Sequence, residues 1–134
     1  VRFDTYPGKP AAAHLTAIGR AIASVLSERD LEALLDAYEF TPGDNSQIRD
    51  RDSFMAELQA VRRDGYAFEN EEETFGVACL AAAVPYAGGA AAVAVGVTAL
   101  APQIQEASVG AVSAQVMKAA GWLSALLDDH RTTG

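Results

Sequence analysis

The side chains of this sequence best suited to chemistry are one thiol and two imidazoles. Cys79 is its only cysteine, and His14 and His130 are its only histidines. A cysteine nucleophile acts as the thiolate and needs an adjacent base. Neither histidine is fixed near Cys79 by spacing, and Cys79 stands in an apolar run, where a cysteine usually packs as a small hydrophobe. We therefore expect no catalytic residue. An enzyme that uses Cys79 or the carboxylates is the alternative.

An acidic run at residues 69–73 is the other candidate for chemistry. Its carboxylates could hold a metal, but a calcium-type site needs oxygen ligands spaced along a loop, which a single run does not supply. We expect a solvated acidic turn in which Glu69 alone points inward, with no metal and no cofactor. His14, at the start of the first expected helix, is expected to be structural.

The charge of the chain argues against nucleic-acid binding by this segment. The 134 residues carry a net charge of −8, with a pI near 4.6. The densest basic cluster is the pair Arg62-Arg63, which gives no footprint for a phosphate backbone. The length and an apolar fraction of 50% fit one folded domain.

One long segment, residues 74–105, has no charged residue, and such a run can span a membrane. Small residues dominate it, and Pro85 with Gly88-Gly89 divides it into two pieces of strand length. We therefore expect no membrane span. A single cysteine also excludes an internal disulfide, which fits a cytoplasmic protein.

Helical spacing of apolar residues predicts three helices in the first half of the chain. The second begins at the capping residue Ser27, and the third begins near Asp50 and ends at Gly65, because glycine tolerates the positive φ of a helix C-terminus. A strand then starts at Tyr66. The expected inward positions are Leu15, Ile18, Ile22 and Val25 in the first helix, Leu31, Leu34, Leu35 and Tyr38 in the second, and Phe54, Leu58 and Val61 in the third.

Two β-rich runs, 77–85 and 90–98, flank Tyr86–Gly89, which has the composition of a four-residue hairpin loop. A final helix follows Pro102, with Val109, Val112, Val116, Leu123 and Leu127 along one side, so the expected order is α-α-α-β-β-β-α. If Pro85 and Ala90 flank the loop, directly opposed residue numbers sum to 175. The expected pairs are Val77 with Thr98, Cys79 with Gly96, and Ala81 with Ala94.

Alternation places all six of these side chains on one face of the sheet. This face consists almost wholly of residues with small side chains, and we call it the small-sided face. It leaves room for a ligand, unless helix side chains fill that space. Val93, Val95 and Val97 lie on the other face and are expected to pack under helices.

Four segments together resemble the C-terminal effector-binding domain of IclR-type transcriptional regulators. They are H-L-T-A-I-G-R-A at 14–21, R-R-D-G-Y-A at 62–67, E-N-E-E at 69–72 and G-V-A-C-L-A-A at 76–82. The resemblance implies an α+β fold in which a curved antiparallel sheet is flanked by helices, as in GAF-like and profilin-like sensors. It implies that residues 1–134 form a single effector-binding domain, without the family's winged helix-turn-helix and first strands.

The resemblance also implies partners and a site. The partners are a small organic or aromatic acid, a second copy in a homodimer or homotetramer, and DNA only through the absent domain. First-turn amides at Ala17 and Ile18 favour a carboxylate. Gly96 and Thr98 replace two family serines, Glu69 an aspartate and Arg20 a lysine, which implies a less polar or bulkier effector than glyoxylate. A pure dimerisation module is a further alternative. The implied effector positions are Ala17, Ile18, Glu69, Val77, Cys79, Gly96 and Thr98.

Overall fold

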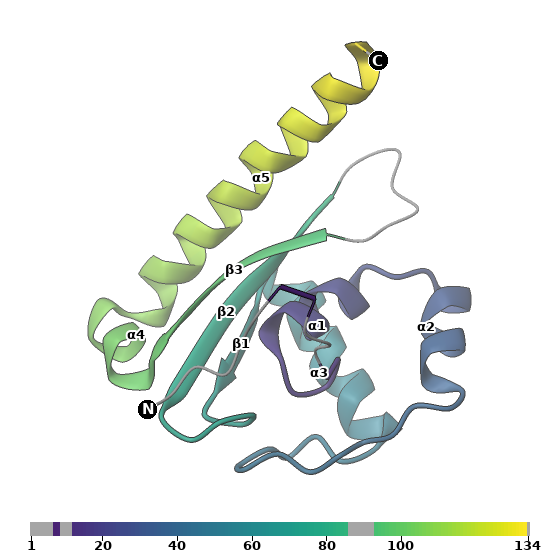
Figure 1. Cartoon of the computed structure of the whole chain (residues 1–134), viewed down its shortest axis with the longest axis vertical. Helices are drawn as coiled ribbons and strands as arrows, with labels where there is room; N and C mark the ends of the chain where they lie inside the picture. The colour runs from purple at the N-terminus through teal and green to yellow at the C-terminus, as the bar shows by residue number, and fades with distance from the viewer. Residues whose placement is uncertain (1–6, 9–11, 86–92, 134) are drawn as a thin grey trace.

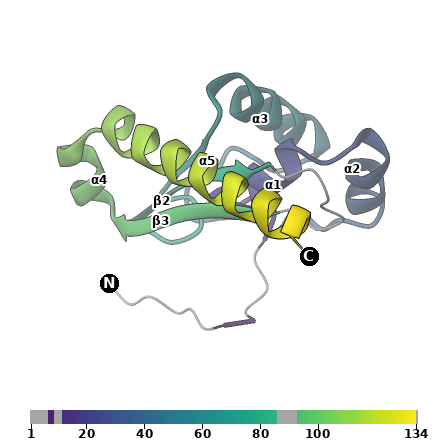
Figure 2. The same cartoon turned by 90° about the horizontal axis from the view of Figure 1, so that it is seen from above.

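A three-stranded antiparallel sheet lies between two groups of helices in this chain. The computed structural model describes residues 7–8, 12–85 and 93–133, with side chains as far as residue 129. Across these residues the strand order is β1-β2-β3, with α1, α2 and α3 on one side of the sheet and α4 and α5 on the other (Figure 1). Figure 2 shows the same layers from above. The elements are α1 (Ala17–Ser24), α2 (Glu28–Leu35), α3 (Arg51–Asp64), β1 (Ala67–Asn70), β2 (Val77–Val84), β3 (Val93–Leu100), α4 (Ala101–Ala107) and α5 (Val109–Thr133). The expected α+β class is confirmed.

Polar caps begin the first three helices. Thr16, Ser27 and Asp50 each accept a hydrogen bond from the amide three residues on, at 3.0, 3.1 and 2.8 Å. Such a bond satisfies one of the free amides of a helix's first turn. Gly65 ends α3 with φ of 85°, a conformation that costs glycine little. The predicted starts of α2 and α3 and the predicted end of α3 are confirmed.

The helix expected after Pro102 is two helices in the structure. Pro102 lies in the first turn of α4, and Ser108, with φ of 74°, separates α4 from α5. The predicted apolar side of the final helix is correct, because it forms one cluster with residues of β2 and β3. The members from α5 are Val109, Val112, Val116, Leu123 and Leu127.

The pairing of β2 with β3 differs from the predicted register by two residues. Cys79 lies opposite Thr98, and Ala81 lies opposite Gly96. The prediction was wrong because it assumed that Pro85 and Ala90 flank the loop, whereas the observed pairs, from Val77 with Leu100 to Val84 with Val93, have residue numbers that sum to 177. The predicted loop and its flanking Ala90 lie outside the described residues. A shift of two keeps every side chain on its face, so the six small-sided residues do share one face.

The helix α1 packs on that small-sided face through alanines. Ala17 and Ala21 form a buried cluster with Ala67 and Ala81, and Val61 of α3 completes it. The opposite face is covered by α5, against which Leu80, Ala82, Val84 and Val95 pack.

Two predictions about buried faces were wrong. Ile18 and Val25, expected to face inward, are 44% and 57% exposed. The helix α1 approaches the sheet closely, and only small side chains fit between them. Val93 and Val97, which were expected to lie under helices, are 36% and 41% exposed, because β3 is an edge strand of the described sheet.

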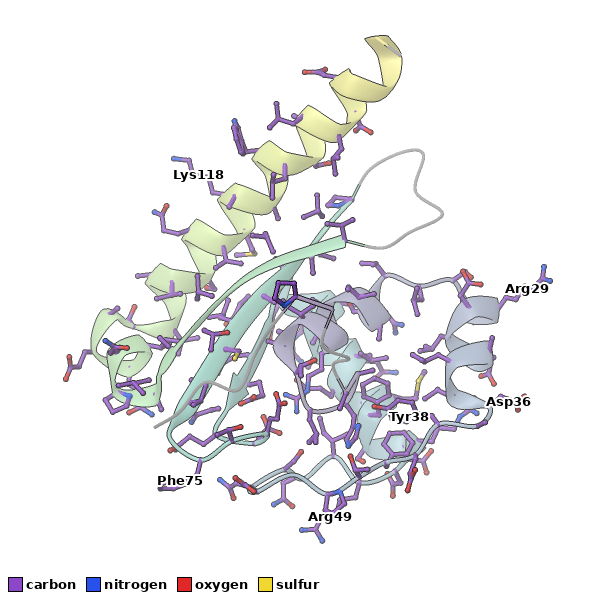
Figure 3. All side chains as sticks on the ribbon, in the orientation of Figure 1. Arg29, Asp36, Tyr38, Arg49, Phe75 and Lys118 are labelled. Atoms are coloured by element: carbon purple, nitrogen blue, oxygen red, sulfur yellow. The ribbon has the colours of Figure 1, made fainter. Side chains whose placement is uncertain are left out.

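Charged side chains lie on the outer surface. The side chains of Arg29, Asp36, Arg49 and Lys118 point away from the body of the protein (Figure 3). Across the described residues, every helix is too short or too polar to cross a bilayer.

Candidate functional site

Three polar side chains form a row across the sheet, on the face that α1 covers. Glu69 of β1 is paired with Cys79 of β2, and Cys79 is paired with Thr98 of β3. The Cys79 Sγ and Thr98 Oγ1 atoms are 3.2 Å apart. Paired residues of neighbouring strands point to the same face. The structure therefore places a carboxyl, a thiol and a hydroxyl side by side, and we call these three residues the polar row.

The Glu69 end of the row is buried and the Thr98 end is open. Glu69 is 1% exposed, Cys79 is half-buried, and Thr98 is exposed. Glu69 Oε2 accepts a hydrogen bond from the amide of Glu72 at 3.2 Å. Burial raises the pKa of the Glu69 carboxyl to about 7, against the opposing effects of this hydrogen bond and of Arg20. The polar row thus contains an acid that changes charge near neutral pH.

A buried guanidinium fixes the turn that follows Glu69. Arg20 of α1 is 1% exposed, and its Nη1 and Nη2 donate to the two carboxylate oxygens of Glu72 at 3.0 and 2.8 Å. Its Nε donates to the carbonyl of His14 at 2.9 Å, and Ser46 Oγ donates to Glu72 Oε1 at 3.0 Å. Burial raises the pKa of Glu72, but the Arg20 and Ser46 bonds outweigh burial and leave it below its ordinary value. Arg20 therefore positions the backbone amide that binds Glu69.

The first turn of α1 borders the polar row. Ala17 is 1% exposed and belongs to the cluster against which Cys79 packs. Thr16 caps the amide of Gly19, so the amides of Ala17 and Ile18 are the ones at the start of the helix that this cap leaves available. Such amides and the helix dipole favour an anion.

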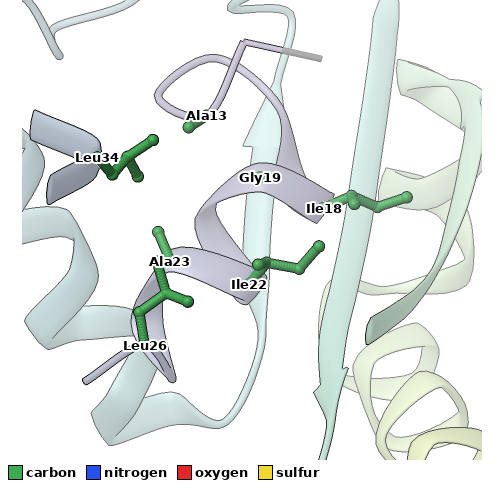
Figure 4. Close-up of a pocket in the computed structure, with 7 residues that line it drawn as sticks. All are labelled: Ala13, Ile18, Gly19, Ile22, Ala23, Leu26 and Leu34. Atoms are coloured by element: carbon green, nitrogen blue, oxygen red, sulfur yellow. The ribbon is translucent and has the colours of Figure 1, made fainter. Parts of the chain in front are cut away.

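The predicted site residues divide into two groups. Ala17, Glu69, Cys79 and Thr98 come together as described. Val77 shares the same face, two residues along β2, and is buried. Ile18 is 44% exposed and lines the edge of a separate groove (Figure 4).

Gly96 occupies the same face, opposite Ala81. A Cβ at this position would lie 2.7 Å from the carbonyl oxygen of Leu80 and 2.9 Å from the Cβ of Ala81. The glycine therefore permits close approach of β3 to β2, a reason that the sequence did not reveal. The space expected in place of a side chain is partly taken by the neighbouring strand.

The groove in Figure 4 lies between α1 and α2 and has a volume of about 240 Å³. It is lined almost wholly by apolar atoms and contains no charged side chain. It can hold apolar surface but offers nothing to orient an acid. Its lining residues are Ala13, Ile18, Gly19, Ile22, Ala23, Leu26 and Leu34.

The geometry does not equip Cys79 as a nucleophile. Burial raises the pKa of the Cys79 thiol above its ordinary value, so the thiol is protonated at neutral pH. The imidazole of His14 is 0% exposed, and its nitrogens contact Tyr38 Oη and the Thr41 carbonyl, each at 2.6 Å. His14 is thus structural, as expected, and the side chain of His130 lies outside the described residues. Within the described residues, no group of three or more metal-ligating side chains could hold a metal ion.

Sequence reasoning missed the structural role of Arg20. We noted it only as a departure from a lysine, although it follows Ala17 by three residues and so lies on the buried side of α1. A basic residue on a buried helix face requires a partner. That pattern indicates a buried ion pair, but it does not identify Glu72.

An open antiparallel sheet with a helix on each face and a polar row under a helix N-terminus describes a small α+β sensor-type domain. Comparison with known proteins identifies its family. Residues 1–125 match the family described as bacterial transcriptional regulator IclR C-terminal, and the chain belongs to this family. The predicted resemblance is confirmed.

Curated relatives are named as transcriptional regulators. The chain is 36% identical over 77 residues to the HTH-type transcriptional regulator XynR of Escherichia coli, covering 58% of this chain and 31% of that protein. It is 30% identical over 118 residues to BhcR of Paracoccus denitrificans, covering 88% of this chain and 42% of that protein. The chain therefore spans less than half the length of these relatives.

Solved structures share the fold. The transcriptional regulator YaiJ superposes with a TM-score of 0.84 at 20% identity, covering 96% of this chain and 72% of that one. The inducer-binding domain of PobR from Acinetobacter, a double mutant in complex with 3-hydroxybenzoic acid, has a TM-score of 0.64 at 25% identity, covering 79% of this chain and 63% of that one.

Proposed function

We propose that this chain is the effector-binding part of a transcriptional regulator and that it takes a small organic or aromatic acid over the polar row. The observation that carries the proposal is the row itself: Glu69, Cys79 and Thr98 lie side by side and open outward at Thr98. The free amides at the start of α1 would receive the carboxylate. Ala17, Ile18, Val77 and Gly96 would contribute backbone or walls.

The family and its relatives support the rest of the proposal. The relatives are named HTH-type transcriptional regulators, and this acidic chain would reach DNA only through a further domain. We place the protein in the cytoplasm, where bacterial DNA lies, as a homodimer or homotetramer. The hydroxybenzoate held by the PobR domain supports an aromatic acid as effector. The absence of a hydroxyl at Gly96 favours a less polar ligand than glyoxylate.

The test is a thermal-shift screen of the chain, followed by titration calorimetry, with 3-hydroxybenzoate, benzoate, pyruvate and glyoxylate. The aromatic acids should raise the melting temperature, because a ligand that binds only the folded state stabilises it. Tight binding of glyoxylate with weak binding of the aromatic acids would contradict the effector size. No shift with any acid would support the dimerisation module instead.

A matched pair of variants locates the site. Thr98→Val removes the hydroxyl while keeping the shape, and it should weaken aromatic-acid binding about fivefold, the effect of one lost hydrogen bond. Thr41→Val makes the same change at an exposed threonine outside the row and should leave binding unchanged. Equal effects of the two variants would place the ligand elsewhere.

A further inference from the structure

Within the part of the chain that the structure describes, the Glu69 carboxyl group has fewer hydrogen-bond partners than a buried carboxylate ion needs. Among the described residues it accepts one hydrogen bond, from the amide of Glu72 at 3.2 Å, although the residue is 1% exposed. A buried charge is ordinarily paired and satisfied by several donors. The neighbouring Glu72 has such partners, because it binds both terminal nitrogens of Arg20 and the hydroxyl of Ser46. The local geometry thus serves an ionised Glu72 and a neutral Glu69.

The charged groups around Glu69 also favour a neutral Glu69 beside an ionised Glu72. The guanidinium of Arg20 is committed to Glu72, and it also lies 3.7 Å from a carboxylate oxygen of Glu57. Two acidic groups of the turn raise the pKa of Glu69, while Arg20 lowers it less than burial raises it. Among the described residues, the titratable groups that interact with Glu69 are Arg20 from α1, Glu72 and Glu73 from the turn, and Cys79 from β2. Glu57 of α3 contacts Arg20.

An acid ligand in the polar row would bring one more carboxylate beside Glu69. Two carboxylates at contact distance cannot both be ionised without a large cost, and they share a proton instead. We propose that Glu69 binds the effector as a neutral carboxylic acid, its O–H donating to a carboxylate oxygen of the ligand. The ligand remains the anion, and the proton remains on Glu69. This inference rests on the proposed function, and it makes Glu69 the residue that selects a ligand with an acceptor at this position.

A thermodynamic consequence follows from this charge state. Where free Glu69 is already protonated, binding takes up no proton. Where it is ionised, above about pH 7, binding must take up one proton, and the dissociation constant should rise about tenfold for each further pH unit. A ligand held by an ionised Glu69 would show no such slope.

Titration calorimetry of the chain with 3-hydroxybenzoate, benzoate, pyruvate and glyoxylate tests this inference. Measurements at about pH 6 and about pH 8.5, each in two buffers of different ionisation enthalpy, count the protons taken up. We expect about zero protons at the lower pH and about one at the higher pH. Binding at the higher pH without proton uptake overturns the role of Glu69 and leaves the proposed function standing. Absence of binding by every acid overturns both.

Two variants assign the proton to Glu69. Glu69→Gln keeps a donor of similar size and should bind the acid with a dissociation constant that varies less than about twofold over this range, without proton uptake. Glu106→Gln, at an exposed acid of α4, should keep the wild-type uptake. A Glu69→Gln protein that melts cooperatively yet retains the pH slope, or that binds no acid, overturns the inference.

Discussion

The sulfur of Cys79 and the hydroxyl oxygen of Thr98 lie 3.2 Å apart at directly paired positions of β2 and β3. This contact joins the thiol to Thr98 within the polar row, beside the buried Glu69. Burial keeps the thiol protonated at neutral pH, and Glu73, and Glu69 where it is ionised, raise the pKa of the thiol further. A thiol in this state is a weak nucleophile, which argues against the enzyme alternative.

Cys79 should therefore react slowly with a thiol reagent, and more slowly when an acid ligand covers the row. Because the chain has one cysteine, the rate of modification by iodoacetamide, followed by mass spectrometry, reports this site alone. We expect a rate below that of free cysteine at the same pH and a further reduction of at least about threefold with saturating 3-hydroxybenzoate. A rate above that of free cysteine would instead revive the enzyme interpretation.

The ion pair between the buried Arg20 and the partly buried Glu72 should be important for stability. Arg20→Met leaves the partly buried carboxylate of Glu72 without its partner. The cost should approach but not exceed the figure of about 3–5 kcal/mol for a fully buried charge. Arg20→Lys keeps the charge but loses the bidentate hydrogen bonds to Glu72. It should therefore lower the free energy of unfolding by less than Arg20→Met does. Urea denaturation measures both.

The exposed pair of Arg51 and Glu32 provides the control for Arg20. Their side chains are 50% and 61% exposed, and an exposed ion pair contributes at most about 1 kcal/mol. Arg51→Met should therefore change the free energy of unfolding far less than Arg20→Met. If the two variants lose similar stability, the network around Arg20 has no special importance.

Local signals in the sequence predicted much of this fold, and the contacts between distant segments explain the errors. Ser27, Asp50 and Gly65 set helix ends through bonds within a few residues, so their roles follow from residue type. The sheet face was predicted correctly because an error of two residues in register preserves it. Residue type did not fix the register of β2 with β3, and the predicted pairing partner of Cys79 was therefore wrong.

Side-chain alternation along the strands and the family resemblance predicted part of the candidate site. They placed Cys79 and Thr98 on one face, and they expected Glu69 to point inward. Helical spacing gave the wrong orientation for Ile18, which is 44% exposed, because α1 packs on the sheet through alanines of both elements. The partnership of Arg20 with Glu72 spans 52 positions, and no local pattern encodes it.

Gly96 should resist substitution because of the neighbouring strand. A Cβ there would meet the backbone of β2 at 2.7 Å, so Gly96→Ala should destabilise the protein by about 1–3 kcal/mol, as overpacking does. Gly110 of α5 has open space at the same position, and Gly110→Ala should stabilise the helix by up to about 1 kcal/mol. Thermal and urea denaturation compare the two. A neutral Gly96→Ala change would show that the strands can separate at little cost.

Glu69 should make the stability of the protein depend on pH in a definite direction. Its pKa is raised by burial from an ordinary value of 4.5 to about 7 in the folded protein, so the folded state holds the proton more tightly than the unfolded chain does. The resulting stability is fully present below about pH 4.5 and is lost as the pH rises through about 7. The loss from this group should amount to about 3 kcal/mol, at about 1.4 kcal/mol for each unit of pKa.

The comparison of wild type with Glu69→Gln isolates this contribution from those of other groups. Free energies of unfolding from urea denaturation at about pH 4.5, 6 and 8 should show the wild type losing stability relative to the variant as the pH rises. The glutamine side chain carries no charge at any of these pH values. Its burial therefore becomes no less favourable as the pH rises. Glu106→Gln, at an exposed position, should run parallel to the wild type. Parallel curves for the wild type and Glu69→Gln would mean that Glu69 has the same proton affinity in both states, against the burial seen here.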